Sequence, residues 1–120
     1  MKRLLVLSVS AIALFALGLR VTRAQAAPQH PDTQKLVMEN TLVRVFEIRV
    51  PAGVAEPRHT HARGLTIALS DYDNETKSYP DGRVNRGHST FGQVRWAEPV
   101  DHEAKNVGTT EQHVIRIEIK

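Results

Sequence analysis

Beyond residue 41, the chain consists of short segments in which apolar and polar residues alternate, and proline or glycine separates one segment from the next. In residues 41–50, Phe46, Ile48 and Val50 share one parity, and β-branched residues are frequent. Alternation with a period of two is typical of strands that bury one face. Residues 65–69 form a second apolar segment, residues 93–97 and 101–107 are short strand candidates, and residues 113–119 alternate again. No helical period is sustained, so the sequence predicts an all-β domain, a small antiparallel barrel or sandwich.

Two further segments add detail to this prediction. Residues 79–82, Tyr-Pro-Asp-Gly, place proline and glycine in turn-favouring order and predict a hairpin. The last segment alternates two sets of side chains, His113, Ile115, Ile117 and Ile119 on one parity and Val114, Arg116, Glu118 and Lys120 on the other. The isoleucines predict that the first set faces the core, with His113 as a core-facing histidine that has a hydrogen-bond partner.

The first 26 residues have the features of a secretory signal peptide. Two basic residues precede an apolar run over residues 4–19, and Ala-Gln-Ala at residues 24–26 matches a cleavage site. The run is shorter than the roughly 20 apolar residues of a membrane span. We therefore expect a periplasmic or secreted protein with no membrane anchor after cleavage, an irregular lead-in over residues 27–41 and one domain over residues 42–120.

The positive charge of the chain belongs to this leader. The chain has 16 Lys and Arg against 13 Asp and Glu, but four of the basic residues lie in the first 26, which contain no acid. The remainder has 12 basic and 13 acidic side chains, a net charge of −1. A nucleic-acid-binding domain would carry a basic surface, so we exclude nucleic acid as a partner.

The chain contains no cysteine, which excludes disulfides, thiolate metal sites, lipid attachment to a leader cysteine and a cysteine nucleophile. The domain must fold without covalent crosslinks. After cleavage, a chain of about 94 residues builds one modest core. A bound metal or oligomerisation would add to its stability.

The histidines point to a metal site. In a strand, His59 and His61 project from the same face, about 7 Å apart along the chain. Imidazole suits iron, nickel, copper and zinc, and three imidazoles with open positions are typical of a catalytic site rather than a closed structural one. His102, in the candidate strand at residues 101–107, is the candidate third ligand.

At this point the sequence resembles the cupin superfamily. Gly53, five residues and then His59-Thr60-His61 match the first cupin motif, and His102 followed by Asn106 matches the end of the second. The resemblance covers residues 43–120. It implies a small jelly-roll β-barrel whose mouth is lined by His59, His61 and His102 as metal ligands, and a homodimer as the assembly.

One departure from the cupin pattern changes the expected chemistry. Thr66 stands where the first motif has a glutamate, with Leu65 beside it, and Ala97 and Pro99 replace the proline and glycine of the second motif. Three neutral imidazoles leave a divalent ion its full charge, which favours an anionic ligand and a lower pKa for bound water. Alternatively, another carboxylate replaces the missing one, and the candidates are Glu56, Glu98, Asp101 and Glu103.

Two functions remain open. The first is a metal-dependent oxygenase acting on a small anionic substrate, as the three-histidine iron sites of the thiol dioxygenase branch of cupins imply. The second is a barrel that binds or senses a small molecule, with or without metal. The metal would be divalent iron, manganese, nickel, copper or zinc. Candidate pocket residues are Thr66, His88 and Asn106, candidate anion-binding residues are Arg63 and Arg95, and no catalytic acid or base is identified.

Overall fold

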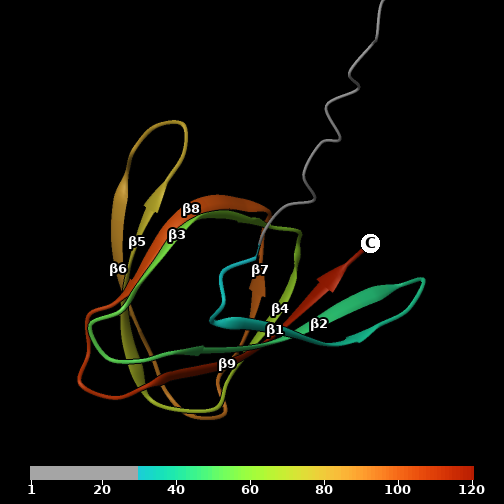
Figure 1. Cartoon of the computed structure of the whole chain (residues 1–120), viewed down its shortest axis with the longest axis horizontal. Coiled ribbons are helices and arrows are strands. Elements are labelled where there is room, and N and C mark those ends of the chain that lie inside the picture. Colours follow the sequence, from blue (N-terminus) through green and yellow to red (C-terminus); the bar gives the residue numbers. More distant parts are fainter. Residues whose placement is uncertain (1–29) are drawn as a thin grey trace, which may run out of the picture.

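The computed structural model describes residues 30–120, which form nine strands joined by turns and loops (Figure 1). The strands are β1 (Gln34–Glu39), β2 (Val43–Val50), β3 (Ala55–His61), β4 (Gly64–Ala68), β5 (Tyr72–Ser78), β6 (Val84–Ser89), β7 (Val94–Ala97), β8 (Val100–Asn106) and β9 (Gln112–Ile119). This arrangement confirms the all-β prediction. Within the same residues, no helix has the length and apolar character needed to cross a membrane. The predicted signal peptide lies outside the described residues.

The strands form two antiparallel sheets that face each other across the interior (Figure 1). One sheet has five strands in the order β1-β2-β9-β4-β7, and the other has four in the order β3-β8-β5-β6. Consecutive strands repeatedly enter opposite sheets, as in a jelly roll. A side chain on the inner face of one sheet therefore meets side chains from the other sheet, which is how residues distant in sequence come together.

The apolar core is small and lies mainly on β2. Phe46, Ile48 and Val50 are buried, together with Val114 of β9. The parity predicted for residues 41–50 is confirmed. β5 and β6 form the hairpin expected around residues 79–82, and Gly82 has the positive φ of 70° that its turn requires.

The irregular lead-in predicted over residues 27–41 is wrong in part, because β1 occupies Gln34–Glu39. β1 pairs with β2 from Gln34 opposite Ile48 to Glu39 opposite Arg44, with a bulge between Leu36 and Met38. The segment is polar and has no clean alternation, so its own pattern did not reveal a strand. Pairing with the edge of β2 supplies the order that local sequence does not.

The predicted core face of β9 is also wrong. Val114, Arg116 and Glu118 are buried, whereas His113 and the three isoleucines are only partly covered. The strand itself was predicted correctly, but the opposite face of it points into the barrel. Its inner face lines a polar cavity, and its outer face continues an apolar row on the neighbouring strands β2 and β4.

Candidate functional site

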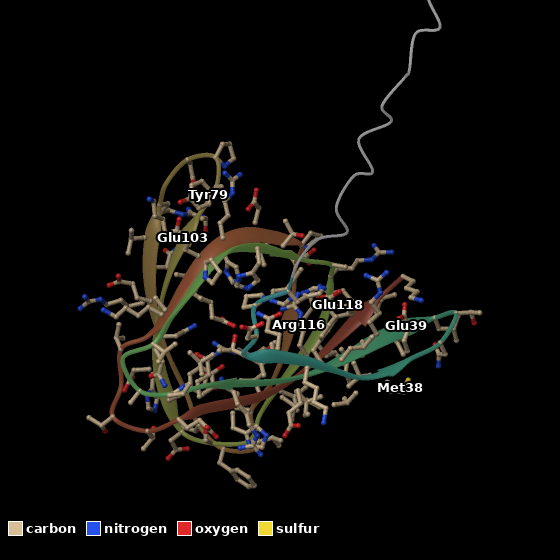
Figure 2. All side chains as sticks on the ribbon, in the orientation of Figure 1. Met38, Glu39, Tyr79, Glu103, Arg116 and Glu118 are labelled. Atoms are coloured by element: carbon tan, nitrogen blue, oxygen red, sulfur yellow. The ribbon has the colours of Figure 1, made fainter. Side chains whose placement is uncertain are left out.

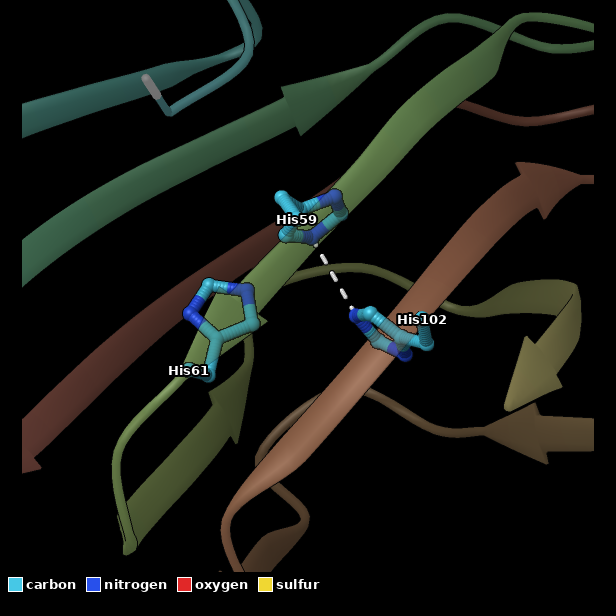
Figure 3. A group of neighbouring side chains, drawn as sticks. All are labelled: His59, His61 and His102. Carbon is cyan, nitrogen blue, oxygen red and sulfur yellow. Dashed lines mark hydrogen bonds between the residues drawn. The ribbon is translucent and has the colours of Figure 1, made fainter. Parts of the chain in front are cut away.

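The structure brings the three predicted ligand histidines together. His59 of β3 lies directly opposite His102 of β8 in the strand pairing, and His61 follows two residues later on the same face. The Nε2 atoms of His59 and His102 are 3.2 Å apart. One ligand atom from each of the three rings lies within 4.8 Å of the others. Figure 3 shows the rings converging between the two strands.

Hydrogen bonds fix the tautomers of two of these rings. Nδ1 of His59 lies 2.7 Å from the carbonyl oxygen of Pro57, and Nδ1 of His61 lies 2.6 Å from Oε1 of Glu118. Both oxygens accept hydrogen bonds, so both Nδ1 atoms carry the proton. Each Nε2 then presents a lone pair, which is the form that binds metal, with an oxygen partner orienting the ring from behind.

The spacing of the His59 and His102 donors also fits an ion. Two imidazole nitrogens bound at about 2.1 Å to one ion, at angles between octahedral and tetrahedral values, lie about 3.0 to 3.4 Å apart. The 3.2 Å between the Nε2 atoms of His59 and His102 falls within this window. Three neutral nitrogen donors of this kind suit a divalent first-row transition metal.

Burial keeps the imidazoles neutral. The loss of hydration on burial lowers the pKa of His61 to about 2, and the positive charge of Arg116 adds to the effect. Burial likewise lowers the pKa of His102 to about 4, followed by the influence of His59 and Arg116. At neutral pH both rings are therefore free of the proton that would compete with a metal.

Polar side chains from β1 and β3 surround His59. The amide nitrogen of Gln34 lies 3.1 Å from Nε2 of His59 and donates a hydrogen bond of 3.0 Å to Oε1 of Glu56. The hydroxyl of Thr33 also donates to Glu56. Both Gln34 and Glu56 are buried. No sequence pattern pointed to Gln34, because it lies in the segment interpreted as irregular.

The histidines open onto a cavity of about 270 Å³ between the two sheets. Thr66, Arg95 and Arg116 contribute to the wall formed by the five-stranded sheet. Arg116 and Glu118 are only 5% and 4% exposed, and Figure 2 shows them in the interior of the barrel. Burial lowers the pKa of Arg116, and the charge of Glu118 acts in the opposite direction.

The three candidate pocket residues have different positions. Thr66 lines the cavity, and its hydroxyl donates to the carbonyl of Arg95 at 3.4 Å. Asn106 does not line it; its buried amide donates to the carbonyls of Val50 and Thr110 and so joins the ends of the strands.

The prediction that His88 reaches the pocket is wrong. It is exposed on β6, with Nδ1 2.7 Å from Asp73, and it lines a different surface cleft. The next residue, Ser89, is the buried one on that strand. The turn at residues 79–82 predicted the hairpin, but which side chains of β6 point into the barrel depends on how the hairpin packs onto it.

Of the four candidate replacement carboxylates, Glu56 is the one that lines the cavity. Asp101 pairs with Arg58, Glu103 accepts from Tyr79, and Glu98 accepts from Trp96. Sequence reasoning missed Glu118, the carboxylate that contacts a histidine of the cluster. Its alternation with isoleucine in β9 placed it on the predicted solvent face.

Sequence comparison finds no matching protein-family profile and no matching curated protein. Solved structures do match. A cupin domain from Bordetella pertussis Tohama I is 26% identical, covers 72% of this chain and 91% of its own length, and superposes with a TM-score of 0.65. The chain belongs to the cupin superfamily.

Other cupin structures share the fold. A cupin 2 conserved barrel domain protein from Salinispora arenicola is 17% identical over 93% of this chain and 87% of its own, with a TM-score of 0.53. An S161A mutant of Bacillus subtilis oxalate decarboxylase is 16% identical over 77% of this chain and 27% of its own, with a TM-score of 0.55. This cupin therefore has the expected barrel and three histidines placed to hold a metal ion.

Proposed function

We propose that this cupin binds one divalent transition metal through Nε2 of His59, His61 and His102 and uses it to oxygenate a small anionic substrate outside the cytoplasm. The observation that carries the proposal is the pair of oriented imidazoles. Pro57 and Glu118 hold the Nδ1 protons of His59 and His61, which leaves the lone pairs directed at one point.

The donor set supports redox chemistry on a bound anion. A redox-active divalent ion supplies the one-electron steps that let dioxygen react with an organic molecule. With three neutral ligands the ion keeps its charge, which favours an anion beside it. We propose dioxygenation, in which both oxygen atoms enter the product and the substrate supplies all four electrons, so no external reductant is required.

The chain's own residues orient the site. Glu118 fixes the ring of His61, and Gln34 lies against Nε2 of His59. The cavity lies between the two sheets and is partly open, with Arg95 at its rim, so a small molecule can enter it.

A specific observation favours a second candidate, a barrel that binds or senses a small molecule without turnover. The two carboxylates nearest the histidines are both engaged, because Glu56 accepts from Thr33 and Gln34 and Glu118 accepts from His61. Neither is free to act as a general base. Dioxygen consumption by the metal-loaded protein, with two labelled oxygen atoms in the product, would distinguish the oxygenase from the binding protein.

The first experiment is elemental analysis of untagged protein purified from the periplasm, with its intact mass testing cleavage after Ala26. We expect close to one equivalent of a first-row metal in the wild type and less than a tenth in a His59→Ala, His61→Ala double variant. His113→Ala is the matched control, since His113 lies on the outer face of β9 and should leave metal content unchanged. A folded wild-type protein that remains free of metal after incubation with each of the five ions would contradict the proposal.

A further inference from the structure

Three polar side chains form a row across the inner face of the five-stranded sheet. Thr66 of β4 pairs with Arg95 of β7 on one side and with Arg116 of β9 on the other. All three line the cavity that contains the histidines. The two guanidinium groups therefore start from positions two strands apart, about 10 Å between backbones, with a hydroxyl between them.

Arg116 is the unusual member of this row. Its side chain is almost fully buried, yet among residues 30–120 its guanidinium makes a single hydrogen bond, from Nη2 to the carbonyl of Ala62 at 2.6 Å. Its Nε is buried without a partner. A guanidinium has five N–H donors, and burying it while those donors lack hydrogen-bond acceptors destabilises the fold. Ala62 directly follows His61, so this cation lies next to the histidine cluster.

Arg95 completes the row from the edge of the sheet. Its side chain is exposed on the edge strand β7, donates to the hydroxyl of Ser89 and still lines the same cavity. Arg95 therefore lies at the rim and Arg116 in the interior. A molecule entering past β7 would meet first one guanidinium and then the other.

The charges in the cavity do not balance. Thr66 is neutral at the position where the first cupin motif has a carboxylate. Of the two carboxylates beside the histidines, Glu56 lines the cavity, whereas Glu118 does not and accepts from His61 behind it. The cavity lining therefore carries two guanidinium groups against one carboxylate, and an anionic ligand would neutralise the remaining positive charge.

We propose that Arg95, Thr66 and Arg116 form a carboxylate-binding subsite, which holds a small organic acid with the rest of the molecule directed at the histidines. This inference rests on the proposed function and names its substrate class. A carboxylate matches the planar donor fork of a guanidinium. The Thr66 hydroxyl can donate to it by giving up its long 3.4 Å hydrogen bond to the carbonyl of Arg95. The cavity has the volume of roughly nine water molecules, which restricts the acid to a few carbon atoms.

Calorimetric titration of malonate into the mature protein, with and without chelator, tests the subsite directly. Malonate has the required charge and size, and malonamide is a neutral molecule of nearly the same shape. We expect malonate to bind wild-type protein whose metal has been removed by the chelator. We expect malonamide to bind the same protein at least 30-fold more weakly. Inorganic phosphate serves as the tetrahedral anion, and we expect it to bind at least tenfold more weakly than malonate.

Three variants locate the binding. Arg116→Met should weaken malonate binding at least 30-fold, and Arg95→Met should weaken it three- to tenfold because its guanidinium is partly solvated. Arg63→Met is the matched control, since Arg63 is exposed and does not line the cavity, and should stay within twofold of wild type. Thermal unfolding of each variant checks its fold. Arg116→Met removes a buried cation whose Nε has no partner, and should melt close to wild type.

Wild-type affinity in a folded Arg116→Met variant, or equal binding of malonate and malonamide, would overturn the subsite. Stronger binding of phosphate than malonate would overturn the carboxylate assignment. Because the titration uses chelated protein, its result is independent of the metal site. Malonate binding in a protein that never takes up metal would leave the subsite standing and remove the proposed function, and the reverse result would remove the subsite alone.

Discussion

The two faces of the five-stranded sheet have opposite character. On the outer face, strand pairing aligns an apolar row across all five strands, formed by Trp96, Leu65, Ile117, Val45 and Met38. One residue along each of the three strands β7, β4 and β9, the inner face carries Arg95, Thr66 and Arg116. Trp96 and Met38 are 54% and 46% exposed, whereas Arg116 is 5% exposed.

This contrast shows that hydrophobicity alone did not decide which face points inward. A fold that packed its interior for stability would place the isoleucines of β9 inside and its charged residues outside. Here the interior holds a site instead, and buried polar groups are costly unless their partners are satisfied. The inner face of β7, β4 and β9 therefore carries charged and polar side chains, and β2 supplies half of the apolar core cluster.

The largest expected difference in stability is between two histidine–carboxylate contacts, one on each face of the five-stranded sheet. Glu118→Ala removes the buried acceptor of His61 and the nearest negative charge to Arg116, and should lower the free energy of unfolding by about 2 to 4 kcal/mol. Glu47→Ala removes the outer-face partner of His113, 3.0 Å away, and should cost much less, because the contact is solvated. Urea denaturation of metal-free protein measures both.

A Glu118→Gln variant sharpens this comparison. The amide oxygen still accepts from Nδ1 of His61, so we expect about half the loss of the alanine variant. Metal affinity should fall about 10- to 100-fold in Glu118→Ala and less in Glu118→Gln. Equal losses of stability at Glu118 and Glu47 would mean that the buried contact on the inner face stabilises the fold no more than the solvated contact on the outer face.

Two identical truncations test the apolar residues of the same faces. Val114 of β9 is 2% exposed and Val94 of β7 is 57% exposed. Val114→Ala should cost about 2 kcal/mol, since it removes buried methyl groups and leaves a void. Val94→Ala should change stability by less than about 0.5 kcal/mol. Thermal denaturation resolves this difference, and a larger loss at Val94 would show that the outer row is covered in solution.

The smallest effect concerns pH. Three ordinary imidazoles would lose roughly a thousandfold in metal affinity between pH 7.5 and 5.5, because each would bind a competing proton below its usual pKa of about 6.5. Burial lowers the pKa of His61 to about 2 and of His102 to about 4, so neither ring is protonated in that interval.

We therefore expect metal affinity to fall by less than about tenfold over the same range, because protons compete for one imidazole at most. Competition with a metal indicator dye at each pH measures the affinity. A loss approaching a thousandfold would show that the clustered histidines are as well hydrated as histidines on the protein surface.

The sequence predicted the strands that carry a clear period of two, the hairpin around residues 79–82 and the cupin fold. It also predicted the cluster of three histidines, because His59 and His61 are two residues apart in one strand and His102 has its own motif neighbour in Asn106. These signals are local: each depends on spacing within a few residues. The exception was β1, whose order comes from pairing with β2 rather than from its own residues.

The tertiary structure alone decided which face of each strand points inward. His88 and Ser89, or Ile117 and Glu118, alternate in any strand, and a shift of one residue exchanges the faces completely. That choice depends on the opposite sheet, which presents histidines to Arg116 and Glu118 and little apolar surface to the isoleucines. The sequence by itself determined most of the strands and the three clustered histidines. Packing between the sheets determined which charged residues accompany them, because alternation is a property of one strand and burial is a property of two.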